Sequence, residues 1–182
     1  MPERIIILDR DGVINRDSND FVKSAAEWIP LPGSIDAIAA LSAAGYTIAV
    51  ASNQSGLARG LFDETALAAM HAKLRALVEA AGGRVDHIVV CPHGPDDGCD
   101  CRKPEPGLYR QIAEHFSTGL DGVPIIGDSL RDLEAAIAAG AKPILVRTGN
   151  GLKAEPHLQG KLEAVPVFDD LAAAVNSLVP DS

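Results

Sequence analysis

The sequence predicts an α/β fold in which one parallel, Rossmann-like sheet carries helices on both faces, in three layers. Short apolar runs alternate with longer segments of helical character, as in repeated strand–helix–strand units. Apolar residues make up 47% of the chain but aromatic residues only 4%, which indicates a core of Ala, Leu, Ile and Val. With 182 residues and no repeat or linker, the chain is expected to form a single domain over 1–182.

The first elements follow from local signals. Ile5 to Leu8 is an apolar run long enough for a buried strand. Residues 15–30 lack periodicity and are expected to form a loop. Ser34 is expected to cap a helix that runs to about residue 44 and stops at Gly45.

The middle of the chain repeats this alternation. A strand is expected over 46–51, and Asp63 can cap a helix over 64–81. A third strand is expected over 85–90. A helix over 106–116 follows, with proline in its first turn.

The last third predicts two further strand–helix pairs. The fourth strand is expected over 123–126, before an alanine-rich helix over 130–139 that stops at glycine. The strands expected over 143–146 and 165–168 then precede a last helix over 170–178.

Charge and hydropathy exclude several classes of function. The net charge is −9, which argues against a nucleic-acid partner because a broad nucleic-acid footprint needs a basic face. The apolar runs are far shorter than the roughly 20 residues that span a bilayer, so no membrane association is expected. No secretory signal precedes Ile5, and we expect a cytoplasmic protein that acts as a monomer.

Two aspartates mark the end of the first strand. Asp9 and Asp11 are two residues apart, so both side chains can reach one site, and Gly12 lets the chain turn sharply after them. Two adjacent carboxylates are costly unless a cation or a phosphoryl-transfer task requires them. Two solvated aspartates at the end of an edge strand are the ordinary alternative if the motif stands alone.

Three further segments accompany this motif in a fixed order. Ser52 follows the second strand, Lys103 precedes a helix, and Asp128 follows the fourth strand. In an open parallel sheet these strand ends meet at the edge where ligands bind. The order resembles the four motifs of the haloacid-dehalogenase-like phosphatases, and the resemblance covers roughly residues 4–150. The gaps between the motifs hold no cap domain, so the chain resembles capless members.

The resemblance implies an Mg²⁺-dependent phosphatase with an aspartyl-phosphate intermediate. Asp9 would be the nucleophile and Asp11 the general acid and base, with nearby carboxylates favouring its protonated form. Ser52 and Lys103 would stabilise the transferring phosphoryl group. Asp9, Asp128 and the Asp11 backbone carbonyl would hold Mg²⁺.

The fourth motif has structural alternatives. Asp128 could be only the N-cap of the next helix, although Ser129 could cap it instead. Asp132 lies in the first turn of that helix, where dipole stabilisation alone would explain it. We keep Asp132 as a candidate neighbour of the metal ligands.

A cysteine and histidine cluster predicts a second metal site. All three cysteines lie within eleven residues, and Cys91, His93, Cys99 and Cys101 offer the ligands of a closed tetrahedral Zn²⁺ site. A disulfide is the alternative, disfavoured in a reducing cytoplasm. The loop has no apolar residues with which to order itself, so a structural zinc would fix the adjacent Lys103.

Together these features resemble two groups of capless phosphatases, the heptose 1,7-bisphosphate 7-phosphatases of nucleotide-activated heptose biosynthesis and the histidinol-phosphatases. The run from Ser52 to Gly60 is similar to the heptose group and favours a small phosphorylated sugar as substrate. Substrate contacts are carried over onto Asp9, Arg10, Asp11, Asp17, Ser18, Asn19, Asp20, Ser52, Asn53, Gln54, Ser55, Arg102 and Lys103. Arg102 is the candidate for a second phosphate, and Arg59 is a weaker one.

Two other classes share parts of the pattern. A signalling receiver domain also uses strand-end aspartates, Mg²⁺ and a lysine, but it gives no role to Asp11 or the cysteine loop. A DNA-end phosphatase shares several motifs, and the acidic charge weighs against it.

Overall fold

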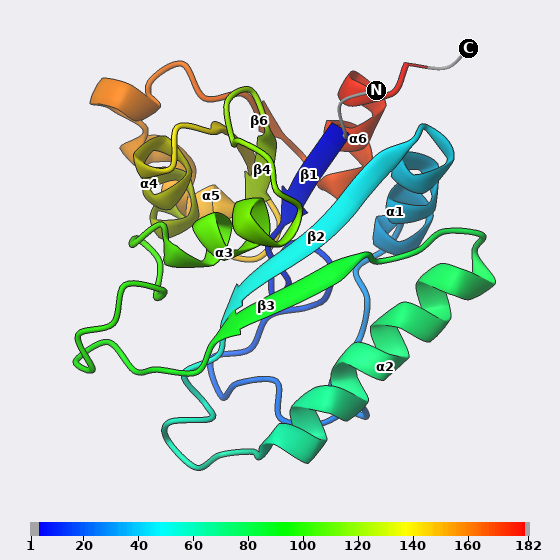
Figure 1. Cartoon of the computed structure of the whole chain (residues 1–182), viewed down its shortest axis with the longest axis vertical. Helices are drawn as coiled ribbons and strands as arrows, with labels where there is room; N and C mark the ends of the chain where they lie inside the picture. Colours follow the sequence, from blue (N-terminus) through cyan, green and yellow to red (C-terminus); the bar gives the residue numbers. More distant parts are fainter. Residues whose placement is uncertain (1–3, 181–182) are drawn as a thin grey trace.

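The computed structural model describes residues 4–180, so the ends of the predicted 1–182 domain lie outside the described residues. Six parallel strands form one sheet in the order β3-β2-β1-β4-β5-β6 (Figure 1). The strands are β1 (Arg4–Leu8), β2 (Tyr46–Asn53), β3 (His87–Cys91), β4 (Pro124–Gly127), β5 (Lys142–Val146) and β6 (Val167–Phe168). The helices are α1 (Ser34–Ala43), α2 (Glu64–Ala80), α3 (Gly107–His115), α4 (Leu130–Ala138), α5 (Gly151–Ala154) and α6 (Leu171–Leu178).

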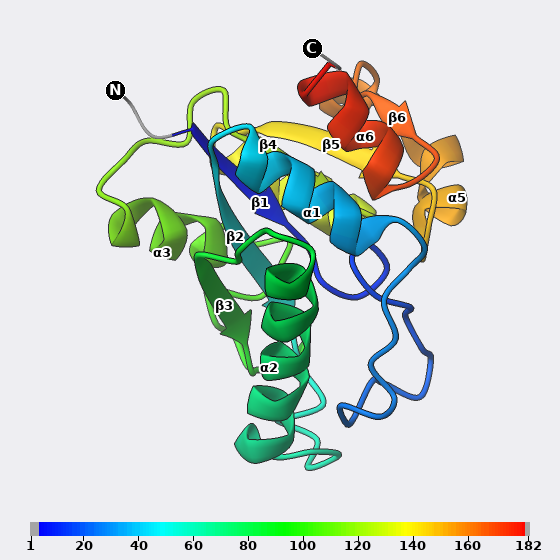
Figure 2. The same ribbon diagram turned by 90° about the vertical axis from the view of Figure 1, so that its right-hand side faces the viewer.

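The helices cover the two faces of the sheet, as the sequence predicts (Figures 1 and 2). On one face, Ile6 and Leu8 of β1 pack in the core that α1, α2 and α6 contribute to. On the other, Ile5 and Ile7 face the core formed with α3 and α4. Alternate residues of β1 therefore anchor both layers, because strand side chains alternate between faces.

The strand order places a topological switch at β1. This strand pairs with β2 on one side and with β4 on the other, so the chain crosses the sheet in opposite directions from it. In open α/β sheets the crevice beyond the carboxyl ends of such strands binds ligands. The segments that carry the aspartate motifs leave β1 and β4 at this position.

Two local expectations are wrong. Ser34 does not cap α1: Gly33 is the N-cap with φ of 78°, while Ser34 Oγ donates to the carbonyls of Ile14 and Leu31. The third strand begins at His87 rather than at residue 85. Just before β3, Asp86 takes the place of regular strand pairing with β2. Its backbone N–H donates to the Ile48 carbonyl, and its carboxylate accepts from the Ile48 N–H.

The remaining boundaries differ from the expected ones by one or two residues, and Asp63 and Asp170 cap their helices with side-chain hydrogen bonds. The sequence pattern does not predict α5 or the two 3₁₀ turns over 155–157 and 160–162. These turns are too short to show a helical period. Within residues 4–180, no helix is both long enough and apolar enough to cross a membrane.

Candidate active site

The candidate site lies where β1 and β4 end side by side. Asp9 directly follows β1, and Asp128 directly follows β4. Two glycines let the chain close around Asp128: Gly12 has φ of +86° and Gly149 has φ of +58°. A Cβ on Gly12 would lie 2.0 Å from Asp128 Oδ2, and one on Gly149 would lie 2.2 Å from it. Neither position can carry a side chain without moving this carboxylate.

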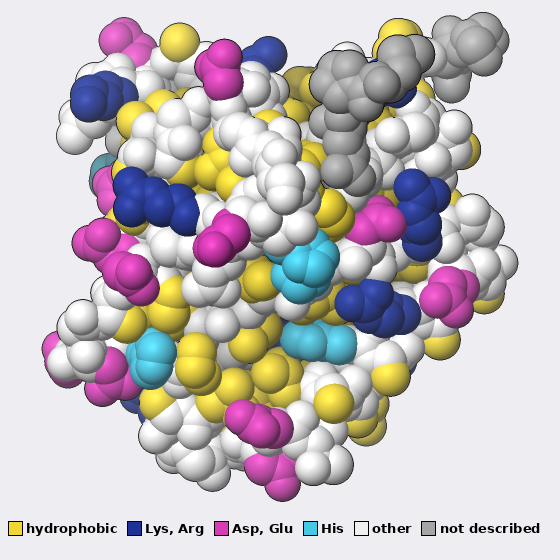
Figure 3. All heavy atoms as spheres, viewed as in Figure 1, with side chains coloured by type: hydrophobic (Ala, Val, Ile, Leu, Met, Phe, Trp, Pro, Cys, Tyr) yellow, Lys and Arg dark blue, Asp and Glu magenta, His cyan; other side chains and the backbone are white. Residues whose placement is uncertain are grey.

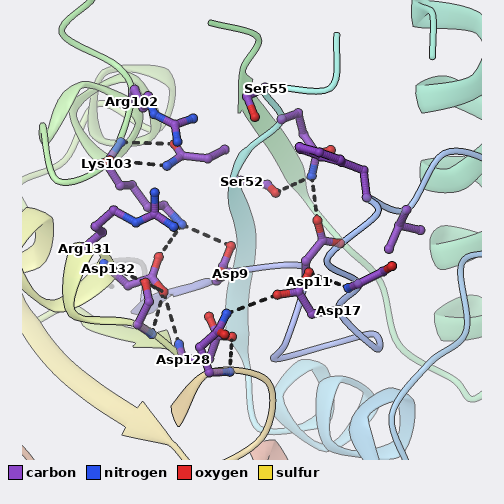
Figure 4. A pocket seen from close by; sticks show the side chains of 17 residues that line it. Asp9, Asp11, Asp17, Ser52, Ser55, Arg102, Lys103, Asp128, Arg131 and Asp132 are labelled. Carbon is purple, nitrogen blue, oxygen red and sulfur yellow. Dashed lines mark hydrogen bonds and ion pairs between the residues drawn. The ribbon is translucent and has the colours of Figure 1, made fainter. Parts of the chain in front are cut away.

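Three carboxylates and one lysine form the centre of the site (Figure 4). Carboxylate oxygens of Asp9, Asp128 and Asp132 lie within 4.8 Å of one another. The Lys103 ammonium is buried and donates to Asp9 at 3.1 Å, to Asp132 at 2.8 Å and to the Ala51 carbonyl at 2.7 Å. One ammonium group therefore lies among three carboxyl groups. The excess negative charge would be neutralised by a divalent cation.

The pKa values of the three carboxyl groups reflect this excess of negative charge. Burial, followed by the nearby Asp132, raises the pKa of Asp9 to about 7. Burial, followed by Asp9 and Asp132, also raises the pKa of Asp128. Burial alone would raise the pKa of Asp132, but its ion pair with Lys103 lowers that pKa below the ordinary value. Asp9 shares Lys103 with Asp132, and Asp128 has no ion pair among the described residues. The hard carboxylate oxygens of Asp9 and Asp128 fit Mg²⁺.

Asp132 stabilises the start of α4, a role that the sequence alone does not settle. Its Oδ2 accepts from the backbone N–H groups of Asp128 and Ser129 and from the Ser129 hydroxyl. Ser129 is the N-cap of α4 and forms a capping box with Asp132. Asp128 is therefore not the cap. Its carboxylate is left for the site, where it accepts from the Asn150 N–H at 3.0 Å.

The end of β2 supplies polar groups on the other side of Asp9. The Ser52 hydroxyl is buried and accepts from Gln54 Nε2 at 2.7 Å. The same amide nitrogen donates to Asp11 Oδ2 at 3.1 Å. Ser52 and Asp11 lie across the pocket from Lys103 (Figure 4), and the Gln54 amide connects them by hydrogen bonds.

The direct partners of Asp11 are donors. Its Oδ1 accepts from Asn15 Nδ2 and from Arg10 Nε, both at 2.9 Å. Its Oδ2 accepts from Gln54 and from Arg10 Nη2. The sequence predicts that crowding by carboxylates keeps Asp11 protonated. Asp9 and Asp17 do lie nearby, but no carboxylate contacts Asp11 directly.

Most of the predicted site residues line one pocket. These are Asp9, Asp11, Asp17, Ser18, Ser52, Asn53, Gln54, Ser55, Arg102, Lys103, Asp128 and Asp132. Three predicted substrate contacts do not line it. The Arg10 side chain is fully buried and points toward α2, Asn19 lines a separate shallow depression, and Asp20 accepts from Lys23 at its carbonyl.

The structure adds pocket residues that no motif predicts: Phe21, Val22, Ser129, Arg131 and Asn150. Asn150 donates to Asp17 Oδ2 at 3.1 Å and so ties the loop after β1 to the segment after β5. Arg131 lies beside Arg102 at one side of the pocket (Figure 4). Arg59 does not line the pocket; its guanidinium lies over the Phe21 ring.

The second predicted site also assembles. Ligand atoms of Cys91, His93, Cys99 and Cys101 lie within 4.8 Å of one another. His93 Nδ1 lies 3.6 Å from the Cys91 sulfur and 3.4 Å from the Cys101 sulfur, and Cys91 and Cys99 are 3.6 Å apart. Tetrahedral zinc with Zn–S bonds of about 2.3 Å separates its sulfurs by about 3.8 Å. The Cys91–Cys101 pair, at 2.7 Å, would open by about 1 Å around such an ion.

Electrostatics at this cluster also favour a cation. Burial raises the pKa of the Cys91 and Cys101 thiols. Burial opposes ionisation of Cys99, but hydrogen bonds from the Arg102 backbone N–H and from Cys91 and Cys101 together outweigh it and lower the pKa of Cys99 to about 7. All three cysteines are free thiols, so the geometry gives no disulfide. The four residues could hold zinc in a closed site, and Cys101 lies two residues before Lys103.

Comparisons with known proteins agree with this geometry. A HAD-hydrolase-like family model matches residues 100–174, and a model described as polynucleotide kinase 3 phosphatase matches residues 4–129. The chain is 59% identical to the D-glycero-beta-D-manno-heptose-1,7-bisphosphate 7-phosphatase of Pseudomonas putida, over 97% of this chain and 99% of that protein. The corresponding Pseudomonas aeruginosa protein is 56% identical over 98% and 99%.

Solved structures give the same result. The D,D-heptose 1,7-bisphosphate phosphatase of B. bronchiseptica, crystallised with magnesium and phosphate, superposes with a TM-score of 0.94 at 56% identity, over 98% of this chain and 99% of that chain. The Burkholderia thailandensis enzyme has a TM-score of 0.76 at 41% identity, over 98% and 100%.

Proposed function

Because the chain belongs to the heptose 1,7-bisphosphate 7-phosphatase family of haloacid-dehalogenase-like hydrolases, we propose that it removes the 7-phosphate of D-glycero-beta-D-manno-heptose 1,7-bisphosphate. The observation that carries this proposal is the pocket in which Asp9, Lys103 and Asp128 converge at the switch point of the sheet. The product would be a heptose 1-phosphate, which suits nucleotide-activated heptose biosynthesis. The monomeric state stays a prediction.

The chain's own residues account for both steps of the reaction. An Asp9 oxygen attacks phosphorus, the bond to the sugar oxygen breaks, and Asp11 gives that oxygen its proton. Asp11 then takes a proton from water, which attacks the aspartyl-phosphate and releases inorganic phosphate. Lys103 and Ser52 stabilise the transferring group through its oxygens. Both lie beside Asp9, and Lys103 already donates to it.

Two metals complete the proposed site. Asp9, Asp128 and the Asp11 carbonyl would hold Mg²⁺, which offsets phosphoryl charge when bound. The imbalance of one cation against three carboxylates, two of them buried, supports this assignment. Cys91, His93, Cys99 and Cys101 would hold a structural zinc. It would order the loop that delivers Arg102 and Lys103 to the pocket.

The second phosphate of a sugar bisphosphate needs cations away from Asp9. Arg102 and Arg131 both line the pocket, and among residues 4–180 neither guanidinium forms an ion pair with a carboxylate. Burial, followed by repulsion from Arg131, lowers the pKa of Arg102. Two guanidiniums held together without an anion suit a phosphate dianion. We assign both to the 1-phosphate.

Phosphate release from a panel of substrates tests the proposed function. The panel contains heptose 1,7-bisphosphate, histidinol phosphate and DNA with a 3′-phosphate end, because the similarity to polynucleotide kinase 3 phosphatase extends over residues 4–129. We expect the heptose substrate to give the highest kcat/KM. Acidic and basic side chains are interspersed on the face in Figure 3, which presents no basic stripe to DNA. A preference for histidinol phosphate or DNA contradicts the substrate assignment.

A further inference from the structure

We propose that His71, on α2, positions the Asp11 carboxylate for proton transfer by holding the Arg10 guanidinium between them. The proposal rests on the proposed phosphatase activity but not on the identity of the sugar. Arg10 and His71 would be positioning residues, since neither lines the substrate pocket.

The guanidinium grips both oxygens of Asp11. Arg10 Nε lies 2.9 Å from Oδ1, and Nη2 lies 3.2 Å from Oδ2. This fork fixes the plane of the carboxylate as well as its position, because rotation about the Asp11 side chain would break both hydrogen bonds. A lone ammonium could not impose the same plane.

The far side of the guanidinium is held by α2. Arg10 Nη1 lies 3.2 Å from His71 Nε2 and 3.9 Å from the Met70 sulfur, a weak acceptor. The Arg10 side chain is 0% exposed, so water cannot replace either contact. His71 therefore supplies the only strong acceptor that the described residues offer to this nitrogen.

The chemistry of the pair fixes the state of the imidazole. Arginine can only donate, so His71 Nε2 must carry a lone pair and the ring must be neutral. Burial and the neighbouring charges of Arg10 and Arg75 keep it so by lowering the pKa of His71 to about 4. A histidine chosen only for packing would not need to direct its acceptor nitrogen at Arg10.

The helix that carries His71 is itself tied to the loop after β1. Lys73, two residues after His71 on α2, donates to the backbone carbonyls of Ala25 and Trp28 at 2.7 and 2.6 Å. Figure 2 shows this loop beside α2. The Lys73 hydrogen bonds thus hold α2 in position independently of the proposed contacts from His71 through Arg10 to Asp11.

The test compares two replacements of His71. His71→Gln keeps an acceptor within reach of Arg10, whereas His71→Leu removes it and leaves a buried donor unsatisfied. Acid catalysis commonly contributes about 10²–10⁴-fold, so partial misplacement of Asp11 should cost about tenfold or more in kcat/KM for a sugar phosphate. We expect His71→Leu to show this loss and His71→Gln to restore most of it. Met70→Leu, a volume-conserving change at the other contact of Nη1, is the matched control.

A second substrate separates positioning from general damage. p-Nitrophenyl phosphate has a leaving group that needs little protonation, and kcat/KM reports the step in which that group departs. His71→Leu should therefore lose much less kcat/KM on the nitrophenyl ester than on the sugar phosphate. Equal losses on both substrates, or equal losses in the Gln and Leu variants, overturn the proposal.

Two safeguards keep the test decisive. If His71→Leu does not fold, His71→Asn replaces it, since its amide is one methylene too short to reach Arg10. If the wild type does not hydrolyse heptose 1,7-bisphosphate, the same comparison uses whichever alkyl phosphate it does hydrolyse. Failure of the proposed substrate and failure of the positioning role are then separate results.

Discussion

Asn53 holds the backbone of Lys103 from both sides. Its Oδ1 accepts from the Lys103 N–H at 3.1 Å, and its Nδ2 donates to the Lys103 carbonyl at 3.4 Å. Asn53 is the last residue of β2, so one side-chain amide ties the lysine to the sheet that also carries Asp9. The Asn53 amide thus satisfies both backbone polar groups of Lys103, as a neighbouring strand would, although Lys103 lies outside any strand.

Replacement of Asn53 should therefore impair catalysis through Lys103. Asn53→Ala removes both hydrogen bonds and should lower kcat by about tenfold or more, as loss of a positioned electrostatic group commonly does. Asn53→Asp keeps the acceptor and should fall between the wild type and the alanine variant. Steady-state kinetics with heptose 1,7-bisphosphate measure this order. Wild-type activity in Asn53→Ala would show that the lysine needs no such support.

Asp9→Asn should abolish turnover without unfolding the protein. The amide nearly preserves shape but removes the nucleophile. It also removes one of three crowded carboxylates, so in the absence of Mg²⁺ the melting temperature should equal or exceed that of the wild type. Phosphate release and thermal unfolding by circular dichroism measure the two effects. Near-normal activity in a clean preparation would exclude the covalent mechanism.

Zinc analysis tests the cysteine cluster. Protein purified without chelator should contain about one zinc per chain, as a site with three thiolates and one imidazole requires. Cys99→Ser should lower the zinc content, the melting temperature and kcat together. Asp96→Asn, an exposed substitution in the same loop, is the control and should change none of them. A metal-free protein with full stability would contradict the assignment of a structural zinc site.

The order of strands and helices could be predicted because each segment carries its own signals. Asp63 is a cap that the local sequence predicts, and the apolar period indicates the type of each element. Ser34 shows the limit of this reasoning. The same residue type that caps a helix can also donate to distant carbonyls, and only the tertiary position of the Ile14 carbonyl beside Ser34 decides between the two.

The residues of the candidate site also fall into those that the sequence predicts and those that it does not. Asp9, Lys103 and Asp128 are predictable because motif order and strand ends bring them together. Asn150 and Arg131 carry no motif. Asn150 reaches the pocket from the turn after β5, and Arg131 from the first turn of α4. Arg10 shows the converse: the family resemblance implies a substrate contact there, but the alternation of side chains directs Arg10 into the core.

Stability should depend on His71 below neutral pH. The pKa of this imidazole is lowered to about 4 in the folded protein, against about 6.5 when unfolded. The unfolded chain therefore binds the proton first, and stability is lost as the pH falls from 6.5 toward 4. The loss at pH 5 is about 2 kcal/mol at most, because the side chain keeps some solvent contact.

His71→Gln removes this titration while keeping the hydrogen bond to Arg10. Urea midpoints at pH 7.5 and pH 5 should differ less in this variant than in the wild type. Both proteins share every other titrating group, so the difference between the two shifts belongs to position 71. Equal shifts would mean that His71 titrates normally in the folded state.

The recognition of the second phosphate is tested at Arg102 and Arg131. A charge-assisted hydrogen bond is worth about 1.5–3 kcal/mol, so removal of either guanidinium should lower kcat/KM for heptose 1,7-bisphosphate by about 10- to 100-fold. A simple monophosphate ester has no group for these side chains to contact and should lose much less. Arg110→Ala, an exposed arginine on α3 that does not line the pocket, is the control.

The double variant decides whether the two arginines act as one site. If both contact a single phosphate, the effects of Arg102→Ala and Arg131→Ala should not be additive, because the first substitution already frees the phosphate to move. Kinetics of both single variants and the double variant on both substrates give the coupling. If Arg102→Ala impairs both substrates equally, Arg102 acts on the reacting phosphoryl group, as its position next to Lys103 would allow. In that case Arg131 alone should still distinguish the bisphosphate from the monophosphate, since it enters the pocket from the first turn of α4.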